Sequence, residues 1–233
     1  MAWVMHSFAD NEKLVTALTL EIGALLSTAI QERGRAAIAV SGGSTPRTLF
    51  DALSELDIPW SQVVVTLVDE RWVETDDPAS NALLVKRHLL RGLAASALFV
   101  GLKSVDRNPF AAVAEVDARL RADVLPLDMV VLGMGDDGHT ASFFSNAEGL
   151  DMALSMQTPE ACAGIRPNGA PHERMTLTLN TLLGARHLLL HCIGAKKLSV
   201  LQAAMQPGPV NDLPVRAVLH QSKVSLEIYH AAN

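Results

Sequence analysis

Short, continuous runs of apolar residues, separated by segments with helical spacing, constrain the fold of this chain more than any other feature. The clearest runs are Ala36 to Val40, Val63 to Val68, Met129 to Leu132 and His187 to Ile193. Strands that are buried on both faces have this composition, because neither side of the strand faces water. Helices between such strands imply parallel crossover connections. The pattern predicts an α/β fold, a doubly wound domain with a mostly parallel central sheet flanked by helices.

The remaining segments fit the same alternation. Leucine and isoleucine recur every three or four residues from Leu14 to Ile30, which predicts a helix capped by Asp10 or Asn11 and ended by Gly34. Further strands are expected at Trp3 to Phe8, Leu98 to Val100, Arg174 to Leu179 and Val224 to Tyr229, helices at Asn81 to Leu90 and after Asn108-Pro109, a polar loop at Asp69 to Pro78, and a mostly irregular region at Gly135 to Pro171. With no internal repeat or linker-like stretch, we expect residues 1–233 to form a single domain.

The charge balance limits the partners of the chain. Nineteen Lys and Arg against 25 Asp and Glu give a formal net charge of -6, so we expect neither nucleic acid nor an anionic membrane as a partner. The two cysteines, Cys162 and Cys192, fit a reducing compartment, and we identify no signal peptide and no membrane segment. We therefore expect a cytoplasmic protein, either a monomer or a small homo-oligomer.

A glycine turn, Ser41-Gly42-Gly43-Ser44-Thr45-Pro46, follows the run at 36–40, and Pro46 is well placed as the first residue of a helix. Consecutive backbone N–H groups and the hydroxyls of Ser44 and Thr45 at a helix N-terminus favour a phosphate. The alternative is a tight turn that only serves packing. The segment is not a nucleophile elbow, because the second glycine of that motif is missing.

The segment Gly133 to Gly138 formally matches a dinucleotide-binding fingerprint. We reject that interpretation, because Asp136 and Asp137 would place two carboxylates against the pyrophosphate. The acidic pair instead lies beside His139, a residue type suited to general acid or base catalysis near neutral pH. A buried structural histidine is one alternative, and a metal site is another. No nearby residues complete a metal-ligand set of recognisable spacing, so we predict no metal.

Charged residues of both signs follow other predicted strands. Asp69 and Arg71 come after the run at 63–68, Arg174 begins a strand, and Lys197 lies just beyond the turn at Gly194. Each is open to the alternative of an ordinary surface charge. In a doubly wound sheet, ligands bind beyond the carboxyl ends of the strands. We therefore expect the loops after Val40, Val68, Leu132 and Ile193 to converge on one cleft, where two cations would suit a phosphate.

Four motifs occur in order along the chain: Ser41-Gly42-Gly43-Ser44-Thr45-Pro46, Val68-Asp69-Glu70-Arg71-Trp72-Val73, Gly133-Met134-Gly135-Asp136-Asp137-Gly138-His139-Thr140-Ala141-Ser142 and Arg174-Met175-Thr176-Leu177. With them the chain closely resembles the 6-phosphogluconolactonase family over nearly its whole length. The related glucosamine-6-phosphate deaminases and isomerases share the fold, the glycine turn and the Asp-Gly-His segment. The motif is commonly written with Glu where Asp136 stands, a change that keeps the charge.

The resemblance implies hydrolysis of a small-molecule phosphosugar lactone, 6-phospho-D-glucono-1,5-lactone, to 6-phosphogluconate in the oxidative pentose phosphate pathway, with no cofactor. It implies that His139 is the general base that activates water. It also implies two groups of further site residues. Those that hold the phosphate and the substrate are Gly42, Gly43, Ser44, Thr45, Gly138, Arg174 and Lys197. Those that line the sugar and lactone region are Asp69, Arg71 and Asp137. Whether Lys196 or Lys197 matches the family lysine is a matter of alignment, and we favour Lys197.

Two competing functions remain. A sugar-phosphate isomerase or deaminase would need a further proton-transfer group, and the deaminase pattern has a glutamate five residues after the histidine, where this chain has Phe144. Effector-binding domains of sugar-responsive repressors resemble the same fold and bind phosphosugars without turnover. Those proteins normally carry a DNA-binding helix-turn-helix ahead of the domain, whereas here the first strand is expected near Trp3 to Phe8.

Overall fold

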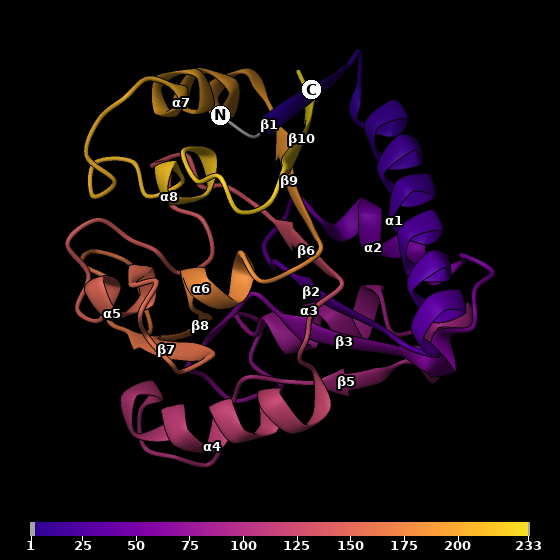
Figure 1. The fold of residues 1–233 in the computed structure, drawn as a ribbon, viewed down its shortest axis with the longest axis horizontal. Helices are drawn as coiled ribbons and strands as arrows, with labels where there is room; N and C mark the ends of the chain where they lie inside the picture. The colour runs from indigo at the N-terminus through magenta and orange to yellow at the C-terminus, as the bar shows by residue number, and fades with distance from the viewer. Residues whose placement is uncertain (1–2, 233) are drawn as a thin grey trace.

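A parallel seven-stranded sheet runs through the centre of the structure, in the order β1-β10-β9-β6-β2-β3-β5 (Figure 1). The structure is a computed structural model that describes residues 3–232. The strands of this sheet are β1 (Trp3–Phe8), β2 (Ala36–Val40), β3 (Val63–Leu67), β5 (Leu98–Val100), β6 (Met129–Leu132), β9 (His187–Ile193) and β10 (Leu226–Ala231). Every residue of β2, β3 and β6 is buried, which explains their uninterrupted apolar sequences. The predicted doubly wound α/β architecture is confirmed.

Helices cover both faces of the sheet. Figure 1 shows α1 and α2 along one side of the molecule and α7 and α8 on the other. The helices are α1 (Asn11–Arg33), α2 (Arg47–Ser54), α3 (Asn81–His88), α4 (Pro109–Asp123), α5 (Leu150–Leu154), α6 (Leu179–Leu182), α7 (Ala195–Met205) and α8 (Arg216–Leu219), with 3-10 turns at Trp60–Gln62 and Gly92–Ser96. Pro46, expected as the first residue of α2, is its N-cap instead.

Helix α1 has the capping that its sequence predicts. The side chain of Asp10 accepts a hydrogen bond from the backbone N–H of Lys13, and Gly34 ends the helix in the left-handed conformation with φ 75°. Among the described residues, α1 is the one helix long and apolar enough to cross a membrane, with a mean hydropathy of 1.5 over its most apolar window. Half of that window is buried inside the domain, where Leu18 and Ile22 pack in the core.

A second, antiparallel sheet is the main departure from expectation. It consists of β4 (Asp69–Arg71), β8 (Arg174–Leu177) and β7 (Cys162–Ile165), in the order β4-β8-β7. The segment at 69–78 was expected as a loop, and the region at 135–171, expected to be mostly irregular, contains α5 and β7. Strands of three or four residues are too short to show alternation in the sequence. The second sheet places Arg71 directly opposite Arg174 and Asp69 opposite Thr176.

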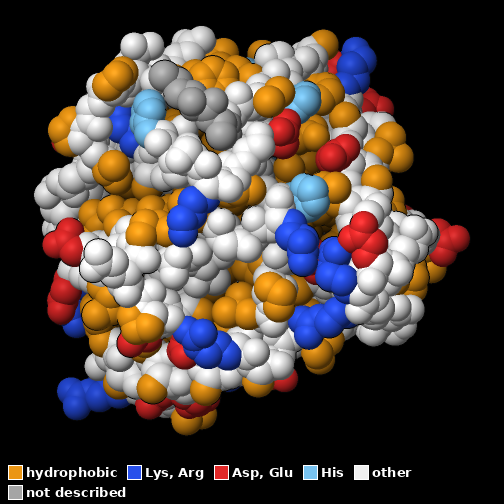
Figure 2. Space-filling view, in the orientation of Figure 1, with side chains coloured by type: hydrophobic (Ala, Val, Ile, Leu, Met, Phe, Trp, Pro, Cys, Tyr) orange, Lys and Arg blue, Asp and Glu red, His pale blue; other side chains and the backbone are white. Residues whose placement is uncertain are grey.

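The surface carries both signs of charge. On the face seen in Figure 2, Lys and Arg side chains lie in small separate groups among acidic, apolar and neutral side chains. Over the described residues this face has no broad basic surface, which is consistent with the negative net charge of the chain. An anionic ligand that bound here would therefore contact individual cations.

Candidate active site

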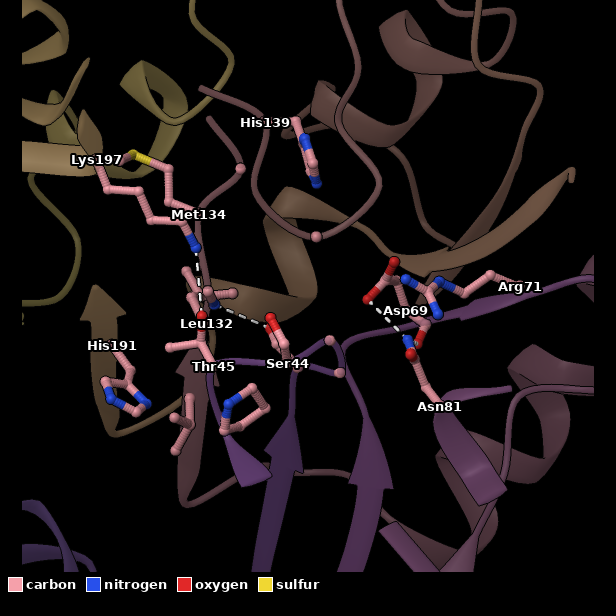
Figure 3. Close-up of a pocket in the computed structure, with 18 residues that line it drawn as sticks. Ser44, Thr45, Asp69, Arg71, Asn81, Leu132, Met134, His139, His191 and Lys197 are labelled. Carbon is pink, nitrogen blue, oxygen red and sulfur yellow. Dashed lines mark hydrogen bonds between the residues drawn. The ribbon is translucent and has the colours of Figure 1, made fainter. Parts of the chain in front are cut away.

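One cavity of about 240 Å³ lies at the carboxyl ends of β2, β3, β6 and β9, where the sequence predicts that four loops converge (Figure 3). In Figure 3, Lys197 and Thr45 lie on one side of the cavity, Asp69, Arg71 and Asn81 on the other, and His139 above them. The predicted site residues that line it are Gly42, Gly43, Ser44, Thr45, Asp69, Arg71, His139 and Lys197. Asp137, Gly138 and Arg174 lie outside this lining.

The glycine turn is fixed to the end of the neighbouring strand β6. The backbone N–H of Ser41 donates to the carbonyl of Val131 at 3.0 Å, and the Ser41 hydroxyl accepts from the N–H of Gly133 at 3.1 Å. Gly43 has φ 97°, a conformation that disfavours any side chain. Among residues 3–232 no side chain caps α2 at Pro46, so the first N–H groups of the helix are open to an external acceptor. This arrangement suits an anion at the end of β2.

The two neighbouring lysines at the start of α7 have different surroundings. The ammonium of Lys197 donates to the hydroxyl of Thr45 at 3.3 Å and lines the cavity. The ammonium of Lys196 pairs with Asp136 at 2.8 Å, is largely exposed, and holds the pKa of that carboxyl below its usual value. Lys197 is therefore the lysine that faces the cavity.

His139 and Asp137 form a pair at the mouth of the cavity. Nδ1 of His139 lies 2.5 Å from Oδ1 of Asp137, which also accepts the backbone N–H of His139 at 3.2 Å. These hydrogen bonds lower the pKa of Asp137 to about 2. An ionised carboxylate only accepts hydrogen bonds, so Nδ1 carries a proton and Nε2 is left with a free lone pair in the neutral ring. The ring packs against Phe144, with 4.3 Å between the centroids.

Asp69 is buried and held by two donors. Its Oδ2 accepts the hydroxyl of Ser142 at 2.6 Å, and the carboxamide of Asn81 donates to its backbone carbonyl at 2.8 Å. The next acidic residue, Glu70, accepts backbone N–H groups at the start of α3 and thereby fixes that helix to β4. The neighbouring Arg71 donates to the carbonyl of Ala79 at 2.6 Å. Strand β4 and the start of α3 thus form one side of the cavity together.

Arg174 lies outside the lining of the cavity, on the strand that pairs with β4. The side chain is 6% exposed, and its Nε and Nη1 have no hydrogen-bond partner among the described residues. Burial, together with the charge of Arg71, lowers the pKa of Arg174. Its guanidinium lies 5.9 Å from the centroid of Phe144, the ring that also packs on His139. The resemblance implies that Arg174 holds the phosphate together with Lys197, and the second sheet pairs Arg174 with Arg71.

Sequence reasoning gave no site role to three residues of this region. Asn81 reads only as the start of a helix, and Ser142 lies inside a motif without a separate signal. The sequence identifies His191 only as part of an apolar strand, yet it lines the cavity, and both of its ring nitrogens are buried without a hydrogen-bond partner in the described part of the chain. Burial, and then the charge of Lys197, lower its pKa to about 4. Within residues 3–232, no three His, Cys, Asp or Glu side chains are grouped as metal ligands.

Comparisons with known proteins agree with the four motifs. A family model, described as glucosamine-6-phosphate isomerases/6-phosphogluconolactonase, matches residues 9–226. The chain is 43% identical over 227 residues to a 6-phosphogluconolactonase of Rhizobium meliloti, covering 97% of this chain and 98% of that protein. It is 44% identical over 202 residues to a 6-phosphogluconolactonase of Pseudomonas aeruginosa, covering 87% and 85%.

Solved structures extend the similarity to three dimensions. The crystal structure of a 6-phosphogluconolactonase from Shewanella baltica superimposes with a TM-score of 0.95 at 42% identity, covering 98% of this chain and 97% of that one. A monomeric glucosamine-6-phosphate deaminase shares the fold, with a TM-score of 0.78 at 16% identity. The resemblance inferred from the motifs is confirmed, and the chain belongs to the family of glucosamine-6-phosphate isomerases and 6-phosphogluconolactonases.

Proposed function

We propose that this chain hydrolyses 6-phospho-D-glucono-1,5-lactone to 6-phospho-D-gluconate, the lactone-opening step of the oxidative pentose phosphate pathway, with a water molecule activated by His139. Relatives that match nearly the whole chain are named 6-phosphogluconolactonase. The observation that carries the mechanism is the pair of His139 and Asp137 above a cavity that has a lysine and a glycine turn on one wall. A base and an anion-binding wall are the two elements that this reaction needs.

The phosphate of the substrate would be held at the end of β2. Ser44, Thr45 and the open N–H groups of α2 supply donors. Lys197 supplies a positive charge that no carboxylate of the described residues neutralises, since Asp136 pairs with Lys196. Arg174 is proposed as a second cation, because two of its guanidinium nitrogens are buried without a hydrogen-bond partner within residues 3–232 and such a group favours an anionic ligand nearby. Because the phosphate is remote from the carbonyl, its binding energy serves to orient the lactone.

The proposed chemistry begins at Nε2 of His139. This atom removes a proton from water while the water oxygen bonds to the lactone carbonyl carbon, giving a tetrahedral oxyanion and an imidazolium. Arg71 or loop N–H groups would stabilise the oxyanion. As the carbonyl reforms, the bond to the ring oxygen breaks and that oxygen takes the proton from the imidazolium. The product is an acid that ionises to the carboxylate, and no cofactor enters any step.

Asp137 has a supporting role in this scheme. Its carboxylate fixes the proton on Nδ1, so that Nε2 is the basic atom, and its charge stabilises the imidazolium. Asp69 and Arg71 are proposed to contact the sugar ring and the lactone from the opposite wall. Gly43 and Gly138 are proposed to let the backbone approach the substrate closely, whereas Gly42 is proposed to contribute its backbone N–H to the phosphate. The cytoplasmic location and the monomeric or small homo-oligomeric state stay predictions.

The decisive experiment measures turnover of freshly prepared 6-phosphogluconolactone. Acid release is followed at constant pH and corrected for spontaneous opening of the lactone. Unphosphorylated gluconolactone serves as the matched control, because it has the same ester without the phosphate. We expect rapid hydrolysis of the phosphorylated lactone and poor hydrolysis of the control. If the phosphorylated lactone opens no faster with the protein than without it, the proposal is wrong.

A further inference from the structure

The carboxamide of Asn81 lies between the two walls of the cavity. Asn81 is the first residue of α3, is 2% exposed, and lines the cavity. On one side its Nδ2 donates to the backbone carbonyl of Asp69 at 2.8 Å and lies 3.5 Å from the carboxylate oxygen Oδ1 of the same residue (Figure 3). Asn81 therefore contacts both the main chain and the side chain of Asp69.

On its other side, the same carboxamide meets the glycine turn. A Cβ built on Gly42 would overlap Oδ1 of Asn81, and the three nearest heavy atoms all belong to this one carboxamide. The φ of Gly42 lies outside the left-handed region, so alanine is compatible with its backbone. Glycine is thus required at this position because of Asn81, and not because of the backbone conformation.

The start of α3 is held by contacts that do not involve the side chain of Asn81. Its backbone N–H donates to Oε1 of Glu70 at 2.7 Å, and the hydroxyl of Ser80 caps α3. Neither contact uses the carboxamide. Oδ1 of Asn81 is buried and accepts no hydrogen bond from the described residues. It packs against Gly42 instead. A change confined to the side chain leaves the start of α3 fixed.

We propose that Asn81 is a positioning residue that sets the spacing between the phosphate-binding turn and Asp69. The inference rests on the function proposed above. A phosphorylated six-membered lactone limits the distance between its phosphate and its carbonyl, because the ring is stiff and only the short CH2–O link to the phosphate rotates. The turn that binds one end and the wall that contacts the other must therefore keep a matching separation. The carboxamide touches Gly42 in the first wall and Asp69 in the second, so it works as a spacer between them.

The test is a double-variant cycle of Gly42→Ala and Asn81→Ala. Asn81→Ala should lower kcat for the phosphorylated lactone roughly 10- to 100-fold while KM changes little, because the turn still binds phosphate but the reacting groups are misaligned. Gly42→Ala alone should be more damaging, since its methyl group displaces the carboxamide. In the double variant the methyl group has room, so adding Gly42→Ala to Asn81→Ala should cost less than about threefold, well below the cost in the native background.

Thermal unfolding and product binding give a readout that does not need turnover. Gly42→Ala should lower the Tm, and the double variant should recover part of the loss. Binding of 6-phosphogluconate, measured by calorimetry, should survive Asn81→Ala. If the wild-type chain fails to hydrolyse the lactone, the proposed function fails, while non-additive Tm values would still support the spacer. If Gly42→Ala fails to fold and the double variant folds, that result also supports it.

Asn108→Ala is the matched control. Asn108 caps α4 by accepting the N–H of Ala111 at 3.0 Å, away from the cavity, so this variant carries the same substitution and should lower the Tm through the loss of a helix cap. Its kcat should equal that of the wild type. Independent, multiplicative effects of Gly42→Ala and Asn81→Ala on both kcat and Tm would overturn the inference. An unchanged kcat in Asn81→Ala, or a loss confined to KM, would overturn it as well.

Discussion

Nδ1 of His139 lies 2.5 Å from Oδ1 of Asp137, and the two residues are separated by a single glycine in the chain. The short loop is closed by hydrogen bonds from Gly138 to Gly135 and from Gly135 to His139. The pair is therefore held by local backbone geometry, and the lowered pKa of Asp137, about 2, keeps its carboxylate ionised well below neutral pH. The proposed base consequently has one defined basic atom, Nε2.

His139→Asn is expected to lower kcat for the phosphorylated lactone by about 100-fold or more, the usual contribution of general acid–base catalysis. Asp137→Asn should have a smaller effect, roughly 10- to 100-fold, because the imidazole remains but loses the partner that orients it. Circular dichroism checks that both variants fold. Near-native kcat in a folded His139→Asn variant would take this residue out of the mechanism.

Lys197→Ala and Lys196→Ala form a matched pair of neighbouring substitutions. A charge-assisted contact with the phosphate contributes about 1.5 to 3 kcal/mol, so Lys197→Ala should lower kcat/KM for the phosphorylated lactone roughly 10- to 150-fold. The same variant should change kcat/KM for unphosphorylated gluconolactone little. Lys196→Ala loses only an exposed pair with Asp136 and should leave both substrates nearly unaffected.

Measuring kcat/KM for the same two substrates in Arg174→Ala tests the role of Arg174. A loss in Arg174→Ala that is confined to the phosphorylated lactone supports a second phosphate cation. We expect the first outcome. Equal proportional losses on both lactones would mean that Arg174 acts on the carbonyl side or on folding, and would contradict its proposed role. In Lys197→Ala, equal proportional losses of kcat/KM on the two lactones would contradict the proposed phosphate site.

The buried His191 makes stability depend on pH. Burial lowers its pKa from 6.5 to about 4, so between these pH values the unfolded chain takes up a proton that the folded chain does not. The free energy of unfolding therefore falls as pH drops through this window, by up to about 3 kcal/mol from this residue. His191→Leu should flatten the dependence.

Urea unfolding at several pH values between 4 and 6.5 measures the effect of His191. His187→Leu, at the exposed start of the same strand, is the control, because it removes a histidine without touching the buried one. A His191→Leu variant with the wild-type slope would show that the buried imidazole takes up its proton without cost in the folded state.

Phe144 separates this chain from the deaminase pattern, which has a carboxylate at that position. Its ring packs on His139 and cannot transfer a proton. We expect no ammonia release from glucosamine 6-phosphate and no isomerisation of ribose 5-phosphate. Enzymatic assays for ammonia and for the ketose product test this expectation. Either activity at a rate comparable to lactone hydrolysis would count against the lactonase proposal.

The sequence by itself determined the strands of the central sheet and the sheet edge at which the site lies. Uninterrupted apolar runs such as Met129–Leu132 and His187–Ile193 identify strands buried on both faces, and the structure has both strands with the same bounds. Parallel strands place all their carboxyl ends at one edge. The loops that carry Ser44, Asp69 and His139 were therefore bound to meet, whatever their detailed conformation.

Only the tertiary structure decided which of these residues touch. The hydroxyl of Ser142 reaches Asp69 across 73 positions of sequence, and the small antiparallel sheet places Arg174 opposite Arg71. The contact of Asn81 with Gly42, and the choice of Lys197 over Lys196 as the lysine in the cavity, are of the same kind. Side-chain periodicity reports the face on which a residue lies, because it reflects burial within one element. Contacts between distant elements depend on how strands pair and helices pack over the whole domain, and no local pattern encodes them.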